Sequence, residues 1–172
     1  MDAERLIATS RRALAESRAA LDIVAEAWQA QSLAQAIGGH LALVGPPELR
    51  GDADGLSEIG GRGFIGPGHP ALRVGGMRAA QLTGVADLRG ALLELGVLLG
   101  EVGIALVGVA CATDEEGLYW QSIEAIDAAD ESSDRVRVML RRLTVRERSR
   151  PPGADRERSS VTDPADSAAK SS

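Results

Sequence analysis

The sequence is poor in the residues that favour β-strands, and this bears directly on the fold class. Aromatic side chains make up only 2% of the 172 residues, whereas Ala (28 residues) and Leu (20 residues) dominate the apolar 44%. Ala and Leu are strong helix formers, while β-branched and aromatic residues favour strands. The composition therefore excludes an all-β fold and favours a helical one.

Cysteine and lysine are also nearly absent. Cys111 is the only cysteine, which excludes an intrachain disulfide and a metal site built from several thiolates. Lys170 is the only lysine, so the positive charge comes almost wholly from arginine. We interpret this as GC-rich coding, because Arg, Ala and Gly codons are GC-rich; a need for guanidinium groups that bind anions through two hydrogen bonds is the alternative.

The overall charge argues against a nucleic-acid partner. The net charge is −6 and the sequence pI is near 5.0, so the chain as a whole repels phosphate backbones. The first residues are charged and lack the apolar segment of a secretory signal. We therefore expect a cytoplasmic protein.

Apolar periodicity predicts an all-α fold, an antiparallel helical bundle of about five helices. Ile7, Leu14, Leu21 and Trp28 recur every seven residues, which is typical of long packed helices. Residues 2–37, 85–112 and 114–148 are predicted as three long helices, and residues 48–64 and 71–82 as two short or broken ones. Residues 1–148 form a single predicted domain. Residues 149–172 lack apolar periodicity, which predicts a disordered C-terminal tail.

The helix predicted over residues 85–112 has the most regular apolar pattern. Its stripe is spaced alternately by four and three residues, and few of its other positions are polar, so we expect neighbours to bury it on several sides. The stripe consists of Leu88, Leu92, Leu95, Leu99, Val102, Leu106 and Val109. Gly96, Gly100 and Gly103 lie beside it and predict a close approach of another helix. The apolar surface continues past these glycines through Leu93, Ile104 and Val107. A membrane span is the alternative, but Glu94 and Glu101 disfavour it.

The sequence predicts no catalytic residue, no metal site and no cofactor, and we therefore expect a protein that is not an enzyme. His40 and His69 stand beside glycine and proline in predicted loops, outside the Glu-x-x-His context of bundle metal sites. Cys111 has no histidine nearby in sequence and is interpreted as a small core residue. The glycines of residues 60–66 lack the preceding strand that a phosphate-binding loop needs.

The helix predicted over residues 114–148 has a packing seam that consists of Tyr119, Ser122, Ile126, Ala129, Ser133, Val136, Leu140 and Leu143. The same helix separates its charges. Residues 114–134 hold eight acids and no base, and residues 135–150 hold seven arginines and one acid. The helix dipole favours this order near the two ends, but the pattern spans the whole helix, and a partner is the alternative. Two copies laid antiparallel would match acid to base. The candidate partner-binding residues are Trp120, Arg135, Val138, Arg142, Val145 and Arg146.

Several segments carry a resemblance to a known family. They are residues 1–7 (MDAERLI), 27–31 (AWQAQ), 45–50 (GPPELR), 114–121 (DEEGLYWQ) and 124–131 (EAIDAADE). Over about residues 1–148 the chain resembles an uncharacterised family of small helical proteins from streptomycete-type actinobacteria, a domain of unknown function. The resemblance implies a helical, cytoplasmic protein and assigns no functional residue.

Three functional hypotheses remain open from the sequence. The first is a non-enzymatic bundle that acts through protein–protein contacts and self-associates. The second is a bundle that binds a small molecule beside the glycines of residues 96–103; a cavity above about 300 Å³ with convergent polar groups would favour it. The third is a protein that docks on a membrane surface through its arginine-rich end, without an integral span.

Overall fold

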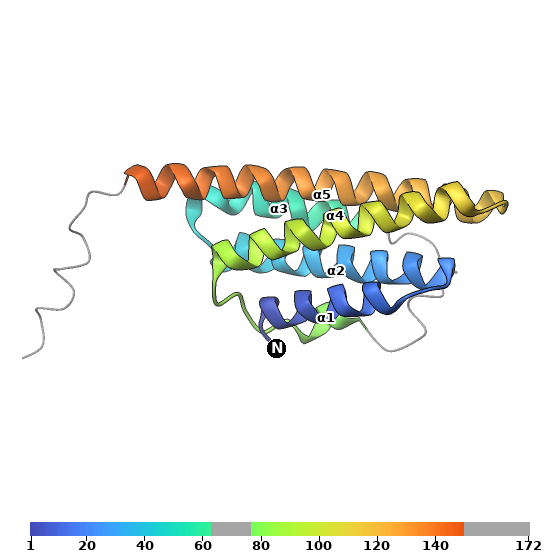
Figure 1. The fold of residues 1–172 in the computed structure, drawn as a ribbon. Helices are drawn as coiled ribbons and strands as arrows, with labels where there is room; N and C mark the ends of the chain where they lie inside the picture. Colours follow the sequence, from blue (N-terminus) through green and yellow to red (C-terminus); the bar gives the residue numbers. More distant parts are fainter. Residues whose placement is uncertain (63–76, 150–172) are drawn as a thin grey trace, which may run out of the picture.

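The computed structural model describes residues 1–62 and 77–149, and in that part of the chain it is a helical bundle (Figure 1). The helices are α1 (Ala3–Glu16), α2 (Ala20–Val44), α3 (Arg50–Arg62), α4 (Leu88–Ala112) and α5 (Glu116–Ser149), with short 3-10 helices η1 (Pro47–Leu49) and η3 (Arg78–Gln81). Helices α1, α3 and α4 run in one direction and α2 and α5 in the other. The predicted all-α bundle is confirmed.

The single long helix predicted over residues 2–37 is wrong, because the chain turns back after Glu16. The hydroxyl and the N–H of Ser17 both hydrogen-bond to the Ala13 carbonyl, which closes the end of α1. Helix α2 then begins at Ala20 and runs antiparallel to α1 along its side (Figure 1). Leu21, expected in the packed seam, is consequently exposed at the start of α2.

A close helix contact forms at Gly38 of α2, which the sequence interpretation did not single out. A methyl group added at Gly38 would lie 2.8 Å from the Ala53 carbonyl oxygen and 2.8 Å from the Ser57 amide nitrogen of α3. Only glycine lets the two backbones approach this closely. The short helix predicted over residues 48–64 is thus confirmed as η1 followed by α3, held against α2.

The helix predicted over residues 71–82 is described only in its second half. Within the described residues 77–82, the regular structure is the 3-10 helix η3, with four residues. The remainder of that prediction, the predicted loop at residues 66–70 and His69 lie outside the described residues.

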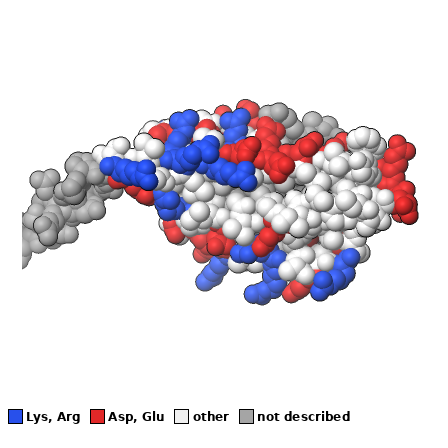
Figure 2. Space-filling model, turned by 45° about the horizontal axis from the view of Figure 1, so that its top comes forward, with Lys and Arg blue, Asp and Glu red and all other residues white. Residues whose placement is uncertain are grey.

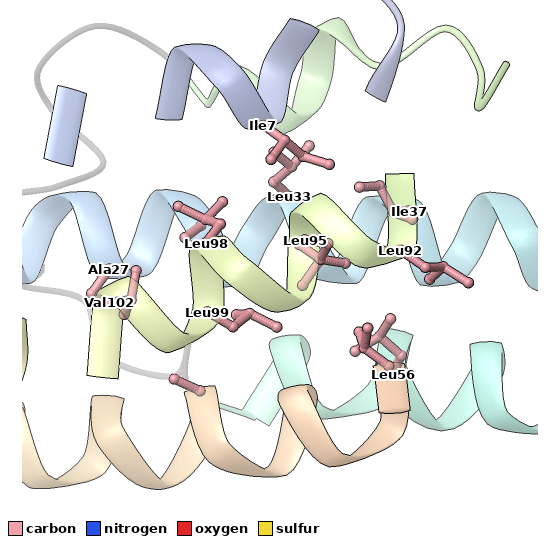
Figure 3. Packing of buried hydrophobic residues seen from close by; sticks show 14 of the residues in the cluster. Ile7, Ala27, Leu33, Ile37, Leu56, Leu92, Leu95, Leu98, Leu99 and Val102 are labelled. Atoms are coloured by element: carbon pink, nitrogen blue, oxygen red, sulfur yellow. The ribbon is translucent and has the colours of Figure 1, made fainter. Parts of the chain in front are cut away.

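Helix α4 lies at the centre of the bundle and packs against α5, α2 and α1. The Asp87 carboxylate accepts a hydrogen bond from the Gly90 amide and caps its first turn. The predicted stripe faces inward: Leu88 is half-buried and the other six members are buried. Figure 3 shows Leu92, Leu95 and Leu99 from this helix between the residues of its neighbours.

Helix α5 buries most of its predicted seam, and its buried face is wider than expected. Ser122, Ala129, Val136 and Leu143 are buried as expected. Of the other predicted members, Ser133 is buried, Ile126 and Leu140 are half-buried against the core, and Tyr119 is exposed. The positions one residue earlier are buried as well: Leu118, Ala125, Ser132 and Met139. One residue is a rotation of about 100°, so the centre of the buried face lies between these two sets of positions.

The boundary of the predicted domain falls at the end of the described chain. The buried residues of α1 to α5 form one continuous core cluster. The tail predicted over residues 149–172 lies outside the described residues, except for Ser149, which ends α5.

By length and composition, α4 is apolar enough to cross a membrane. Its most apolar window of 18 residues has a mean hydropathy of 2.2, and 33% of that window is buried inside the bundle. The central helix of a bundle meets the same criterion.

Candidate interaction surface

The outward face of α4 is apolar and exposed, which corrects the expectation that neighbours bury this helix on several sides. Leu93, Val97, Ile104 and Val107 are between 45% and 78% exposed. Contiguous exposed apolar side chains are rare on monomeric soluble proteins and mark binding surfaces. We call the outward positions Leu93, Val97, Gly100, Ile104, Val107 and Cys111 the outer stripe.

The outer stripe repeats the spacing of the buried one. Its six positions are separated by four, three, four, three and four residues, so they share one side of α4. At about 100° per residue they lie opposite Leu95, Leu99 and the rest of the buried stripe. Two seams with a spacing of 3.5 residues on opposite sides indicate a helix made for neighbours on both sides.

The glycines of α4 do not receive a helix from the same chain, contrary to the sequence prediction. A methyl group added at Gly100 or Gly103 would meet no atom of the described residues within 4 Å. At Gly96 it would lie 3.6 Å from Val136 Cγ1 of α5, an ordinary contact. Gly100 therefore leaves an unfilled space in the middle of the outer stripe.

Ion pairs with α1 border the outer stripe on one side. Arg11 binds Glu101 through two hydrogen bonds of 2.7 and 2.9 Å and binds Glu94 through a third of 2.9 Å. The hydrogen bond from Arg11 holds the pKa of Glu101 below its usual value, and the hydrogen bond to Glu101 raises the pKa of Arg11. The two carboxylates that interrupt the apolar surface of α4 are thus both hydrogen-bonded to one guanidinium.

Two grooves lie along the same side, between α4 and the α1–α2 turn. One has a volume of about 510 Å³ and includes Leu14, Ala15 and Ile104 in its lining. The other, of about 540 Å³, includes Arg18, Ile23 and Leu118. Ala105 lines both, so the grooves adjoin along the C-terminal half of α4.

Helix α5 borders the outer stripe on the other side. Arg89 of α4 binds Glu147 at 2.7 Å and donates a hydrogen bond to the Thr144 hydroxyl. Figure 2 shows the uncharged band between charged ridges, with arginines and acids separated along α5. An apolar strip with a charged rim is the usual anatomy of a protein interface.

The candidate residues predicted on α5 divide into two groups. Arg142 binds Asp52 at 2.6 Å and Arg146 binds Glu48 at 2.8 Å, so both pair with acids of their own chain in or next to α3. Arg135 also turns to α3, where its guanidinium lies over Gly55. These three arginines therefore face α3 or η1 of their own chain.

The other three candidates are not gathered at one place. Val145 is exposed and Val138 is half-buried, both in the C-terminal half of α5. Trp120 is exposed near the opposite end, with its ring 5.3 Å from that of Tyr119 in an edge-to-face contact. The distance along the helix between Trp120 and Val138 is about 27 Å at 1.5 Å per residue.

Buried polar contacts elsewhere join the helices rather than form a reactive centre. Gln31 of α2 donates a buried hydrogen bond of 2.7 Å to the Ser132 hydroxyl of α5. Glu26 forms an ion pair with Arg78 of η3; burial raises the pKa of this carboxyl, and Arg78 opposes that rise. Both contacts attach separate segments to α2.

The histidine and the cysteine considered as metal-binding or catalytic residues lie elsewhere in the fold than predicted. His40 lies within α2 and not in a loop, and Cys111 is exposed near the end of α4 and not in the core. In the described ranges 1–62 and 77–149, no three His, Cys, Asp or Glu side chains are grouped closely enough to hold a metal ion.

The sequence analysis identified some members of the outer stripe as apolar but did not predict that they are exposed. Leu93, Ile104 and Val107 were expected to extend the buried surface. The signal that distinguishes them is their own spacing, which defines a second seam opposite the first.

Comparison with known proteins places the chain in a family without assigning it an activity. No curated protein and no solved structure matches the chain. The model of one family matches residues 1–142, which include all of α1, α2, α3 and α4 and most of α5. The chain belongs to this family, the family of unknown function DUF6099.

Proposed function

We propose that this protein acts by binding other protein chains, its own copies included, and not by catalysing a reaction. The observation that carries the proposal is the outer stripe of α4, where Leu93, Val97, Ile104 and Val107 are exposed on a folded bundle. Burying such side chains in a contact contributes about 25 cal/mol per Å² of apolar surface. The charged rims along α1 and α5 would supply the orientation of a partner.

The arrangement of polar groups supports a bundle helix over a membrane span. The inner stripe of α4 is already committed to α1, α2 and α5, and Arg11 binds both Glu94 and Glu101. Leaving the bundle for a bilayer would separate these contacts. A cytoplasmic location and an origin in a high-GC actinobacterium, supported by arginine usage and by the resemblance, are part of this proposal.

The test is site-specific photo-crosslinking in cells that express the protein. A photoreactive amino acid replaces Ile104, which is 78% exposed on the outer stripe, and in a second variant replaces Leu43, which is 80% exposed on α2. We expect protein adducts from position 104 and few from position 43. Equal labelling at both positions, or none at position 104, would contradict a protein-binding role for the stripe.

A small-molecule role is the second candidate, supported by the grooves of about 510 and 540 Å³ beside Ala105. Both exceed the volume of about 300 Å³ that small-molecule pockets require. They lie on the α1 side of α4 and not beside Gly100 and Gly103, where the sequence interpretation placed a pocket. Release of apolar ligands from the natively purified protein on denaturation, detected by mass spectrometry, would favour this role.

The third hypothesis, membrane docking through the arginine-rich end of α5, has less support. Arg142 and Arg146 bind Asp52 and Glu48 of their own chain, which lowers the positive charge that this end presents. Salt-sensitive binding of the protein to anionic vesicles would support this hypothesis.

A further inference from the structure

We propose that two copies of this chain associate through the outer stripes of their α4 helices, arranged antiparallel. The two-fold axis of this pair lies in the contact plane between the two helices, at the height along α4 midway between residues 98 and 99. This inference rests on the proposed function and names the partner, the surface and the register. Three features of the molecule support it: the spacing of the stripe, the space at Gly100, and the position of the charge boundary on α5.

The spacing of the outer stripe determines which residues can face each other. In an antiparallel pair of helices with this alternating spacing, a residue that is followed by a gap of four faces a residue of the partner helix that is followed by a gap of three. With the axis between Leu98 and Leu99, residue numbers that face each other sum to 197. Leu93 then packs against Ile104 of the second copy, and Val97 against Gly100.

The space at Gly100 supports this register. No atom of the described residues lies within 4 Å of a methyl group added there, although Gly100 is central in the stripe. Val97, three residues away on the same face, is exposed. A valine that enters the space over a glycine lets two helices pack closely at the centre of their contact.

The charge boundary on α5 selects the same axis independently. Helix α5 changes sign between Asp134 and Arg135, with eight acids in residues 114–134 and six arginines with one acid in residues 135–149. Gly96 lies beside Val136, and α4 and α5 run antiparallel, so the boundary lies beside residues 97 and 98 of α4. This is within about one residue of the axis derived from the apolar spacing.

The symmetry then matches acid to base. The two-fold axis lies in the contact plane and is perpendicular to both α4 helices. It therefore places the two α5 helices on the same edge of the pair, where they run antiparallel to each other. The acidic half of each α5 consequently faces the arginine half of the other. Arg141 has no ion pair among the described residues, and neither do Asp127 and Asp130, which the register places opposite it.

The same charges disfavour an anionic membrane as the occupant. An apolar strip that enters such a membrane carries a basic rim. The rim of the outer stripe is instead mixed, because Glu94 and Glu101 pair with Arg11 on one side and both halves of α5 border the other. The chain as a whole carries a net charge of −6.

Disulfide trapping tests the register directly. Full-length Leu93→Cys and Ile104→Cys proteins, each with Cys111→Ser, are purified separately and oxidised alone or mixed. Both sites are exposed, so the substitutions leave the core intact. We expect a disulfide-linked dimer mainly in the mixture, because a disulfide needs Cα atoms about 4.4–6.8 Å apart. Identical cysteines would lie about 16 Å apart along the helices, a displacement of eleven residues.

Dimers linked through identical cysteines, without mixed dimers, would show parallel pairing and overturn the proposal. Absence of any linked dimer, with a monomer in sedimentation of the unmodified protein, would also overturn it. If position 104 nevertheless crosslinks to another protein in cells, the proposed protein-binding function stands and only the self-association fails. Binding of the monomer to phosphatidylglycerol vesicles through Ile104 would assign the surface to a membrane instead.

Charge exchange provides a second test in solution. Arg141→Glu is expected to weaken the dimer about tenfold at low salt, and Asp127→Arg with Asp130→Arg in the same chain is expected to restore it. Raising the salt from about 0.05 to about 0.5 M should weaken the unmodified dimer similarly, because the Debye length falls to a few ångströms. A dimerisation affinity that changes neither with the charge reversal nor with the salt concentration would overturn the proposed orientation.

Discussion

Arg11 of α1 and Glu101 of α4 face each other between these two neighbouring helices and share two hydrogen bonds, of 2.9 and 2.7 Å. The guanidinium and the carboxylate lie 90 residues apart in the sequence, and a third hydrogen bond joins Arg11 to Glu94. This arrangement fixes α1 beside α4 and turns the only acids of the α4 surface toward one partner. It also leaves the outer stripe uncharged.

Removal of the Glu101 charge should change stability in a pH-dependent way. Because Arg11 lowers the pKa of Glu101 in the folded chain, ionised Glu101 contributes stability above its unfolded pKa of about 4.3, and this contribution is lost as the pH falls. Glu101→Gln should therefore cost about 0.5–1 kcal/mol near neutral pH and little in acid. Urea unfolding at several pH values measures this. A cost that stays constant into acid would contradict the ion pair.

Substitution of Gly38 should destabilise the contact between α2 and α3. In Gly38→Ala the added methyl group meets two backbone atoms at 2.8 Å, and such overpacking costs about 1–3 kcal/mol. Gly51→Ala in α3 is the matched control, because nothing lies within 4 Å there and alanine should stabilise the helix by up to about 1 kcal/mol. Equal stability of the two variants in thermal unfolding would disprove the close approach.

Substitution of Gly100 should stabilise the fold in dilute solution. Gly100→Leu replaces a poor helix former with a good one at a position without neighbours, so we expect a gain of almost 1 kcal/mol. Gly96→Leu is the control: its longer side chain meets Val136, which should cancel the gain. If Gly100→Leu were destabilising in the monomer, the space beside Gly100 would already be occupied.

The buried hydrogen bond between Gln31 and Ser132 should contribute measurably to stability. Ser132→Ala leaves the Gln31 amide without this acceptor, and an unsatisfied buried donor costs about 1–3 kcal/mol. Ser122→Ala is the matched control, because Ser122 is equally buried on α5 but donates only to the Leu118 carbonyl of its own helix. Denaturant unfolding should separate the two variants by about 1 kcal/mol or more.

The candidate site was only partly predictable from the sequence. The inner stripe was correctly predicted, because a 4,3 spacing of Leu and Val determines which side of a helix is apolar. The same reasoning cannot tell whether a second apolar side, such as that of Leu93 and Ile104, meets another helix or solvent. Likewise, the arginines of α5 were interpreted as partner-binding because Asp52 and Glu48, their partners, are about 90 residues earlier in the chain.

The sequence by itself determined the helical class, the bounds of α4 and most of α5, and the separation of charge along α5. These follow from composition and periodicity, which act over a few turns of helix. Only the tertiary structure decided that the chain turns at Ser17, that Gly38 and not Gly100 receives a neighbouring helix, and that the buried face of α5 is wider than its predicted seam. Each of these depends on packing between distant segments, where the shape of the space left by other helices outweighs local preference.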